Sequence, residues 1–191
     1  MQLILASSSV YRQQLLKQLK IPFQTSSPDI DETSKIGEGP KDLVLRLAKE
    51  KAKAVAHEFS SHLIISSDQV AVIEDEIIGK PLVHEAAVTQ LTKASGKTVS
   101  FYTSICLLNS NSGSTQLDFE ITKVKFRKLS LQQIDNYLKK DKPYDCAGSF
   151  RAESLGITLF DSIQSNDPNA LIGLPLIKLS NFLKNSGIKF Y

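Results

Sequence analysis

The segment from Leu63 to Pro81 constrains the fold of this chain more than any other stretch. Its opening run, Leu63-Ile64-Ile65, has the length and the β-branched content of a buried strand. The run ends on Ser66-Ser67-Asp68-Gln69. We therefore expect the carboxylate of Asp68 to lie where a core strand emerges, on a rigid element.

A hairpin is predicted for the rest of this segment. The apolar run Val70–Ile73 turns through three acidic residues into Ile77-Ile78 and then Gly79-Lys80-Pro81. Such a hairpin would return Lys80 toward the end of the sheet that carries Asp68. An acid and a lysine on neighbouring strands suit metal–phosphate chemistry, whereas a solvated aspartate in a turn is the plain alternative.

A helix is predicted from Pro40 to Phe59, with proline at its start and strong helical periodicity. At about 100° per residue, one arc of this helix is apolar. The apolar residues of that arc are Leu43, Val44, Leu47, Ala48, Ala54 and Val55. Lys51 falls in the middle of the same arc. A lysine there must extend its ammonium to solvent or meet a partner anion, and a phosphate group is one such anion.

The N-terminal residues predict a strand from Gln2 to Ala6 and a helix from Val10 to Leu19. Serines between a strand and a helix are natural N-caps. The same position exposes backbone N–H groups at the positive end of the helix dipole, where phosphate binds readily. Both roles are open for Ser7, and Arg12, one turn into the helix, would point toward an anion held there.

A polar loop follows the strand that is predicted at Phe23–Ser26. Within four residues it carries three carboxylates, from Asp29, Asp31 and Glu32. Acidic residues in loops are usually just solvated, but a metal ligand can be among these three.

The remainder of the chain alternates helix-like and strand-like runs. Helices are expected at His84–Ala94 and from Leu129-Ser130 onward, and a final helix follows Ile172-Gly173-Leu174-Pro175 and runs to about Leu183. Strands are expected at Thr98–Leu108, at Leu117–Arg127 and up to Phe160. The polar loop before the last strand contains Arg151 and Glu153. The interleaving predicts an α/β fold, and the long 98–127 hairpin makes its sheet mixed rather than purely parallel.

Composition bounds the function. The chain has 191 residues, 41% of them apolar, which suits one compact domain or two closely joined lobes. We expect a single domain over 1–191. A net charge of +3, from 23 basic and 20 acidic residues, is too balanced to predict nucleic-acid binding. No apolar run approaches the ~20 residues that span a bilayer, and the N-terminus lacks the features of a signal peptide. We therefore expect a cytoplasmic protein with neither a membrane nor a nucleic-acid partner.

Several classes of chemistry are disfavoured by the residues that the chain lacks. It has no GxxxxGK[ST], HExxH or GxSxG motif and no GxGxxG after a strand, and its three histidines are scattered. Histidine-based catalysis is therefore not expected. Cys106 and Cys146 form neither a metal-ligand cluster nor a disulfide framework, so we expect both to be reduced, small core residues.

Nine short motifs follow one another along the chain: LILASSSVYR at 3–12, DET at 31–33, LVLRLAKEKA at 43–52, IISSDQV at 64–70, GKP at 79–81, KASG at 93–96, FYTS at 101–104, CAGSF at 146–150 and GLPL at 173–176. Each motif is weak by itself, whereas the ordered set is specific. The set resembles the Maf family of nucleotide pyrophosphatases over essentially the whole chain. The resemblance implies a Maf/ITPase-like fold, with a mixed twisted sheet flanked by helices and an active-site cleft between two lobes.

The resemblance also implies an activity, the metal-dependent splitting of a nucleoside triphosphate into the monophosphate and pyrophosphate. Asp68 would be the catalytic residue, as general base or equally as a metal ligand, and Glu32 would be the second carboxylate at the metal. Every candidate ligand is an oxygen atom, which favours Mg²⁺ or Mn²⁺. The residues that would hold the triphosphate are Ser7, Arg12, Lys51 and Lys80.

Within the family, the chain resembles most the branch that hydrolyses 7-methyl-GTP. That branch carries an aromatic residue, a glutamine and a glutamate at the positions that Tyr11, Gln69 and Glu153 hold here. Two features depart from the branch. Its aromatic residue is usually tryptophan, and its usual proline and second arginine are replaced here by Val10 and Gln13.

The chemistry of the base agrees with this choice of branch. A 7-methylguanine ring carries a positive charge, and an aromatic face such as that of Tyr11 attracts a cation by ~0.5–2 kcal/mol. The carboxylate of Glu153 would accept two hydrogen bonds from the N1–H and N2–H edge of guanine while balancing the charge. An amide at that position would not supply the charge.

Two other hypotheses are left open. One is a pyrophosphatase for other modified or non-standard nucleotides, and the other is a nucleotide-binding regulator of cell division whose hydrolysis is incidental. A homodimer is also left open, since related folds often pair.

Overall fold

The computed structural model describes residues 1–191, which form two compact units. The first unit comprises Met1–Asp68, Thr103–Glu120 and Asp167–Tyr191, and the second comprises Gln69–Tyr102 and Ile121–Asn166. Strands β6 (Thr98–Asn109) and β7 (Thr115–Phe126) contribute residues to both units. The prediction of one domain over the whole chain therefore stays a prediction, and each unit is described by itself.

The sheet of the first unit is mixed. Its strands lie in the order β2 (Phe23–Ser26), β1 (Gln2–Ala6), β3 (His62–Ser66) and β6. Strand β1 is parallel to both of its neighbours, whereas β3 is antiparallel to β6, with Ser66 opposite Cys106. Because β3 is central and buried, the residues that follow its carboxyl end leave the sheet from its interior.

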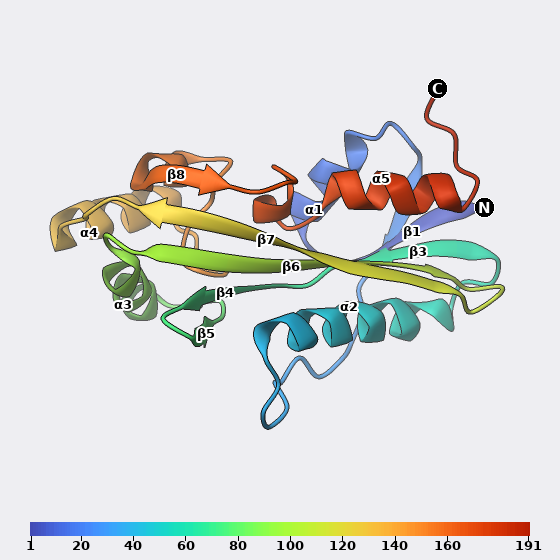
Figure 1. Cartoon of the computed structure of the whole chain (residues 1–191), viewed down its shortest axis with the longest axis horizontal. Helices are drawn as coiled ribbons and strands as arrows, with labels where there is room; N and C mark the ends of the chain where they lie inside the picture. Colours follow the sequence, from blue (N-terminus) through green and yellow to red (C-terminus); the bar gives the residue numbers. More distant parts are fainter. The chain divides into compact units, whose positions relative to one another are not determined.

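Helices cover both faces of this sheet (Figure 1). On one face lie α1 (Val10–Lys17) and α5 (Leu176–Asn185), and on the other lies α2 (Pro40–Ala56). Successive side chains of a strand point to opposite faces. Leu3 and Leu5 of β1 accordingly pack toward α1 and α5, whereas Ile4 and Ala6 pack toward α2. The continuous apolar runs of β1 and β3 are therefore explained by burial on both faces.

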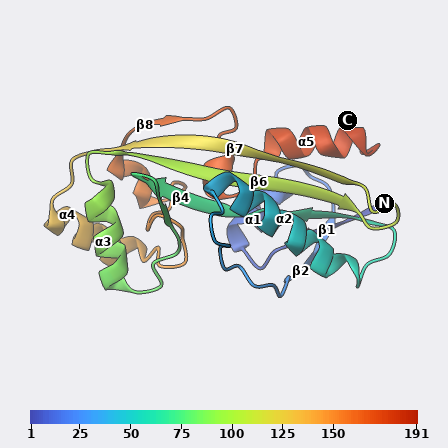
Figure 2. The same ribbon diagram turned by 60° about the horizontal axis from the view of Figure 1, so that its bottom comes forward.

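The second unit contains β4 (Gln69–Ile73), β5 (Glu76–Ile78) and β8 (Phe160–Gln164), with helices α3 (His84–Ala94) and α4 (Leu131–Asp141). Strands β4 and β5 form an antiparallel hairpin, and β8 pairs antiparallel with β7. Helices α3 and α4 pack together (Figure 2). Phe150 stands edge-on against three other phenylalanine rings, which are Phe101, Phe126 and Phe160. These rings form the aromatic core of the unit.

Most predicted elements are confirmed, including the hairpin after Asp68, the helix at His84–Ala94 and the long hairpin of β6 and β7. The two N-terminal helices end earlier than predicted. Helix α1 stops at Lys17, and Lys20 then adopts a positive φ of 57°, which no helix can continue. Helix α2 stops at Ala56, three residues before Phe59.

One predicted strand is wrong in its position. The residues before Phe160 form a 3₁₀-helix, η1 (Leu155–Leu159), and the strand β8 begins only at Phe160. Gly156 lies so close to the backbone of Arg151 that a side-chain carbon would come within 2.3 Å of that carbonyl oxygen. The chain therefore turns tightly here instead of extending.

The two cysteines are free thiols, as expected. Cys106 is a buried core residue, and burial raises the pKa of its thiol to about 11. Cys146 is only half-buried, which corrects the expectation that both cysteines lie in the core. Burial nevertheless raises the pKa of the Cys146 thiol to about 12, so neither side chain is a thiolate nucleophile at neutral pH.

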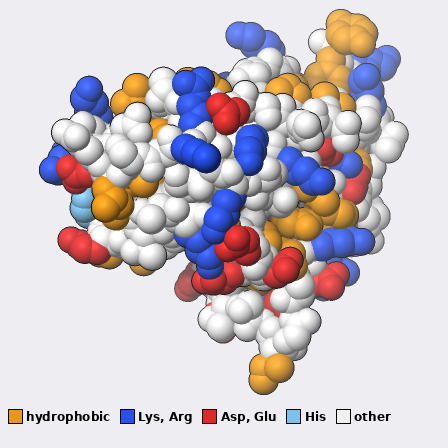
Figure 3. Space-filling view, turned by 60° about the vertical axis from the view of Figure 1, so that its left-hand side comes forward, with side chains coloured by type: hydrophobic (Ala, Val, Ile, Leu, Met, Phe, Trp, Pro, Cys, Tyr) orange, Lys and Arg blue, Asp and Glu red, His pale blue; other side chains and the backbone are white.

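Charges of both signs are interspersed on the face of the molecule in Figure 3, in keeping with the nearly balanced composition. No helix of the structure is long and apolar enough to cross a membrane.

Candidate active site

Asp68 directly follows strand β3 and is held there by the backbone. Its N–H donates to the hydroxyl of Ser104 at 3.0 Å, and its carbonyl oxygen accepts from the N–H of Ser104 at 2.9 Å. The side chain is only 6% exposed. The sequence prediction that a carboxylate would stand at the end of a core strand is thereby confirmed.

Lys51, on the buried face of helix α2, forms ion pairs with two carboxylates. Its Nζ lies 2.6 Å from Oδ1 of Asp68 and 2.8 Å from Oε1 of Glu32. Lys51 is 6% exposed, as its place in the apolar arc predicted. The anion that satisfies this buried ammonium in the structure is thus a pair of carboxylates from the chain itself.

The loop that carries Glu32 is held by Arg46 of helix α2. The guanidinium of Arg46 donates from Nε and Nη2 to both oxygens of Glu38, at 2.6 and 2.7 Å, and from Nη2 to the carbonyl of Thr33 at 3.0 Å. It also donates to Glu50 at 2.9 Å. Such bidentate pairs fix direction as well as distance. Arg46 therefore fastens both ends of the loop segment that follows Glu32, whose own side chain is more than half exposed.

The start of helix α1 brings two further candidates to this unit. Ser9 is the N-cap, and its hydroxyl accepts from the N–H of Arg12 at 3.4 Å. The hydroxyl of Ser7 accepts from the N–H of Ser9 at 3.1 Å, so Ser7 orders the turn before the helix. Both readings of the serines, N-capping and phosphate binding, remain compatible with this arrangement.

Arg12 lies within electrostatic reach of the two carboxylates. Desolvation lowers the pKa of its guanidinium, while the negative charges of Asp68 and Glu32 raise it. Its Nε donates to the carbonyl oxygen of Gly173 at 2.9 Å. The same oxygen accepts a hydrogen bond from the hydroxyl of Ser67 at 2.8 Å.

Sequence analysis missed the contributions of Ser67, Ser104, Arg46 and Gly173. All four lie inside the motifs quoted above, but no periodicity shows what their side chains or carbonyls contact. The partners of Ser67 and Ser104 lie far away in the chain, at separations of 106 and 36 residues. Arg46 binds Glu38 only eight residues earlier, within the irregular loop. A glycine before Leu-Pro is the one local signal that a backbone group was needed there.

The carboxylate pair is suited to a divalent cation. Mg²⁺ is usually bound by one or two carboxylates together with substrate phosphates and water, rather than by a cage of protein ligands. Asp68 and Glu32, which share one ammonium, provide such a pair. The structure contains no group of three or more His, Cys, Asp or Glu side chains that could hold a metal ion. The donors present therefore fit Mg²⁺ or Mn²⁺ and do not fit a zinc-type site.

The four remaining candidates are placed individually. Tyr11 is half-buried on α1 in the first unit, and Gln69 is the half-buried first residue of β4 in the second unit. Lys80 is exposed and follows β5. Glu153 lies in the loop before η1, where desolvation and the charges of Asp141 and Asp145 raise the pKa of its carboxyl more than Arg151 lowers it. The functional roles given to these four stay predictions.

Comparison with known proteins gives one family. The family model described as Maf-like protein matches residues 2–186. A curated protein of Nitrosococcus oceani, named 7-methyl-GTP pyrophosphatase, is 52% identical over 185 residues, which cover 97% of this chain and 93% of that protein.

Two solved structures match this chain over part or most of its length. The Ham1 protein of Staphylococcus aureus matches with a TM-score of 0.53 and 13% identity over 97% of this chain and all of that one. A nucleoside-triphosphatase, described as a dITP/XTP pyrophosphatase, from Mycobacterium abscessus matches with a TM-score of 0.42 and 16% identity over 68% and 76% of the two chains. At such identities the Ham1 likeness concerns the fold alone, and it agrees with the predicted mixed sheet flanked by helices.

The contact between Arg46 and Glu38 predicts a specific pH dependence of stability. Hydrogen bonds from Arg46 lower the pKa of the Glu38 carboxyl from 4.5 to about 2. A lowered folded-state pKa stabilises the fold fully above the unfolded value, and this stabilisation is lost as the pH falls from 4.5 toward 2. We expect Glu38→Gln to be less stable than the unchanged protein at pH 7 and the difference to shrink between pH 4.5 and pH 3.

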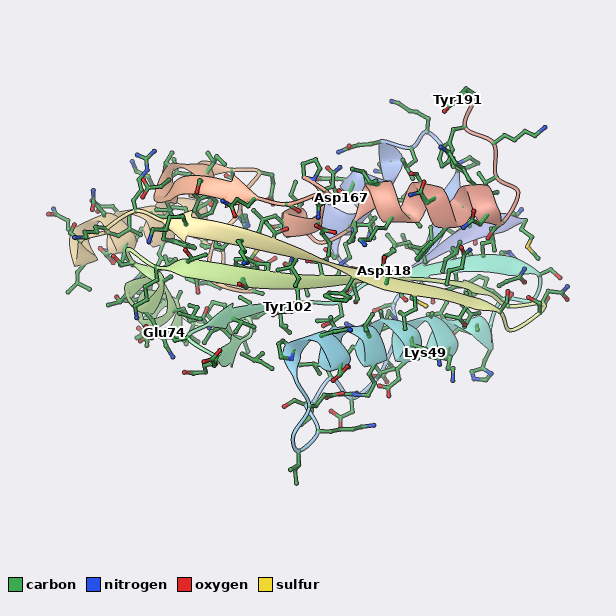
Figure 4. All side chains as sticks on the ribbon, viewed as in Figure 1. Lys49, Glu74, Tyr102, Asp118, Asp167 and Tyr191 are labelled. Atoms are coloured by element: carbon green, nitrogen blue, oxygen red, sulfur yellow. The ribbon has the colours of Figure 1, made fainter.

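Urea unfolding at pH 7, 4 and 3 measures this difference. Glu74→Gln, an exposed glutamate of the second unit that pairs with Lys97 and is labelled in Figure 4, is the matched control. A difference between Glu38→Gln and the unchanged protein that stays constant across these pH values would contradict the assignment.

Proposed function

The chain belongs to the Maf family, and on that premise we propose that it hydrolyses 7-methyl-GTP to 7-methyl-GMP and pyrophosphate. One observation carries the proposal. Two carboxylates, Asp68 and Glu32, converge on the buried ammonium of Lys51 beside Arg12, in a chain that is 52% identical to a protein named 7-methyl-GTP pyrophosphatase. Acids and cations gathered in one cluster are the groups that phosphoryl chemistry needs.

The proposed reaction is attack of water on the α-phosphorus with pyrophosphate as the leaving group. Negative charge shifts onto the phosphate oxygens during this step, and fixed cations lower its barrier. Arg12 and Lys51 supply two such cations, and Ser7 is a further proposed phosphate ligand of the same unit. The role of Lys80 as a phosphate ligand stays a prediction. Asp68, held by Ser104 at the end of β3, accepts the proton of the attacking water, or would serve as a ligand of the metal.

The proposed cofactor is Mg²⁺ or Mn²⁺, held by oxygens of Glu32 and Asp68 together with the triphosphate. Bound there, the ion would lower the pKa of the attacking water and offset phosphate charge. The ammonium of Lys51 already contacts one oxygen of each carboxylate. Lys51 and a divalent cation therefore contend for the same ligands, and an ammonium displaced from them is free to contact phosphate. Both predicted roles of the cluster, metal binding and phosphate binding, are reconciled in this way.

The choice of base is proposed to rest on Tyr11, Gln69 and Glu153. The ring of Tyr11 offers a face to the cationic 7-methylguanine, and the carboxylate of Glu153 offers acceptors and a balancing charge to its N1–H and N2–H edge. Glu153 is exposed, so its carboxylate is accessible to a ligand, and desolvation is the largest cause of the raised pKa of its carboxyl.

The two alternative functions make different demands on the site. A pyrophosphatase for other modified nucleotides would use the same first-unit cluster with a different preference for the base. A regulator that only binds nucleotide would have no use for a buried carboxylate at the reacting phosphate, and the presence of Asp68 there favours an enzyme. A cytoplasmic location and a homodimer stay predictions.

Asp68→Asn tests the reaction itself. We expect it to fold normally and to lose at least about a thousandfold in the rate of pyrophosphate release, because an amide neither accepts the proton of water nor binds the metal as a carboxylate does. Pyrophosphate release is measured on a panel of nucleoside triphosphates, with and without Mg²⁺ or Mn²⁺.

The matched control is Asp118→Asn, an aspartate of β7 that pairs with Lys178 and is labelled in Figure 4. It should keep the rate of the unchanged protein. Near-normal hydrolysis by Asp68→Asn would remove the assignment of Asp68, and the strongest turnover on a nucleotide other than 7-methyl-GTP would replace the proposed substrate.

Lys51→Met tests the competition for the carboxylates. Without nucleotide, we expect the variant to bind Mn²⁺ about tenfold more tightly, because the ammonium that holds both carboxylates is gone. Hydrolysis should fall at the same time, since the phosphates lose a cation. Electron paramagnetic resonance of free Mn²⁺ measures the affinity.

Lys49→Met removes one positive charge from an exposed position of the same helix, labelled in Figure 4, and controls for net charge. Equal or weaker Mn²⁺ binding by Lys51→Met than by Lys49→Met would show that the ammonium and the ion do not compete.

Glu153→Gln tests the choice of base. The variant keeps the acceptor geometry on one oxygen but removes the charge, so the ratio of kcat/KM for 7-methyl-GTP over GTP should fall about tenfold. Glu74→Gln serves again as the control in the same unit. Equal turnover of GTP and 7-methyl-GTP by the unchanged protein would leave the proposed selection without a basis.

A further inference from the structure

We propose that Ser67 and Gly173 are positioning residues for Arg12, which they turn toward the phosphate-binding side of the carboxylate cluster. The inference rests on the proposed function, because it takes Arg12 to be a phosphate ligand. It goes further by stating what sets the direction of the guanidinium. The observation behind this proposal is that one carbonyl oxygen, that of Gly173, accepts hydrogen bonds from both Arg12 and Ser67.

The carbonyl oxygen of Gly173 accepts from Nε of Arg12 at 2.9 Å and from the hydroxyl of Ser67 at 2.8 Å. A carbonyl oxygen has two lone pairs, so these two donors use its full capacity. Ser67 is fully buried and immediately precedes Asp68. The shared oxygen thereby connects the arginine of α1 to the chain segment that carries the catalytic carboxylate.

The oxygen is presented by a rigid turn. Asp167, 1% exposed, accepts from the N–H of Asn169 at 3.1 Å through Oδ1 and from the N–H of Ile177 at 2.6 Å through Oδ2. The hydroxyl of Thr103 donates to the carbonyl of Ala170 at 2.9 Å. Asp167 thus satisfies a free N–H in the first turn of α5, beside which it lies in Figure 4. These bonds hold the turn at both ends.

Glycine is required for the direction of this carbonyl. Gly173 has φ +125°, a backbone conformation that residues with a side chain rarely adopt. A side-chain carbon there would lie 3.5 Å from Nε of Arg12, which is an ordinary contact. The need for glycine therefore comes from the backbone conformation and not from a lack of space.

Engagement of Nε has a consequence for the rest of the guanidinium. The group is planar and carries five N–H donors in a fixed fork. Holding Nε fixes the plane and leaves the Nη donors for an anion. Arg12 is the one arginine of α1, so no second guanidinium in that helix can take over the task. Its direction therefore matters more than its charge alone.

A double-mutant cycle on the affinity for pyrophosphate tests the proposal. Isothermal titration of the full chain with pyrophosphate and Mg²⁺ is measured for Ser67→Ala, Arg12→Ala and the double variant. We expect Ser67→Ala to weaken binding about fivefold, the size of one hydrogen bond. In the Arg12→Ala background, Ser67→Ala should cause no further loss, because Ser67 acts through Arg12.

Ser66→Ala is the matched control. Ser66 is also a fully buried serine, but its hydroxyl donates to the carbonyl of Ala48 and not to Gly173. Its effect on pyrophosphate affinity should be equal in the presence and absence of Arg12. Additive effects of Ser67→Ala and Arg12→Ala, or unchanged affinity in Ser67→Ala or in Arg12→Ala, would overturn the proposal.

Arg12→Lys tests the same bond from the other side and does not depend on the folding of Ser67→Ala. Lysine keeps the charge but has no Nε–H for Gly173 and no planar fork. On a logarithmic scale, we expect Arg12→Lys to recover less than half of the pyrophosphate affinity that is lost in Arg12→Ala. Affinity equal to that of the unchanged protein would show that charge suffices and would overturn the positioning role.

The experiments distinguish a wrong substrate from a wrong positioning role. A non-additive cycle in a protein that does not hydrolyse 7-methyl-GTP supports the positioning role and removes the proposed substrate. An additive cycle in a protein that hydrolyses 7-methyl-GTP removes the positioning role alone.

Discussion

The site depends on one ion cluster, in which the buried ammonium of Lys51 lies between the buried carboxylate of Asp68 and the more exposed carboxylate of Glu32. Burying charges is costly, and leaving one of them without its partner typically costs about 3–5 kcal/mol. The cluster therefore needs elements that hold all three side chains in place. Strand β3 holds Asp68, the apolar face of α2 directs Lys51 inward, and Arg46 fastens the loop of Glu32.

Local patterns predicted the parts of this arrangement that local physics determines. A β-branched run bounded by polar residues was enough to find β3 and to place Asp68 at its end. Helical periodicity was enough to find Lys51 in a buried stripe, and the cost of burying an ammonium was enough to require an anion. Which anion would meet it was not predictable, because Glu32 comes from a loop without periodicity.

The parts that escaped prediction depend on distant contacts or on backbone conformation. The positive φ of Gly173 and the direction of its carbonyl follow from a turn that Asp167 and Thr103 hold from elsewhere in the chain. The 3₁₀-helix η1 stands where a strand was predicted, and there Gly156 packs against the backbone carbonyl of Arg151, a contact that the sequence does not reveal. Roles of Lys80 and Glu153, which lie in the second unit, rest on resemblance and not on a contact with the cluster.

The near cancellation of charge in the cluster has a consequence for the order of ligand binding. Two carboxylates and the two cations Lys51 and Arg12 sum to zero formal charge, so the site offers little net attraction to a lone cation or to a lone anion. On the proposed function, a divalent ion that binds the carboxylates leaves a positive site for the triphosphate, and a bound triphosphate leaves a negative site for the ion. Each ligand thus raises the affinity for the other by the same factor, which is positive cooperativity between metal and nucleotide.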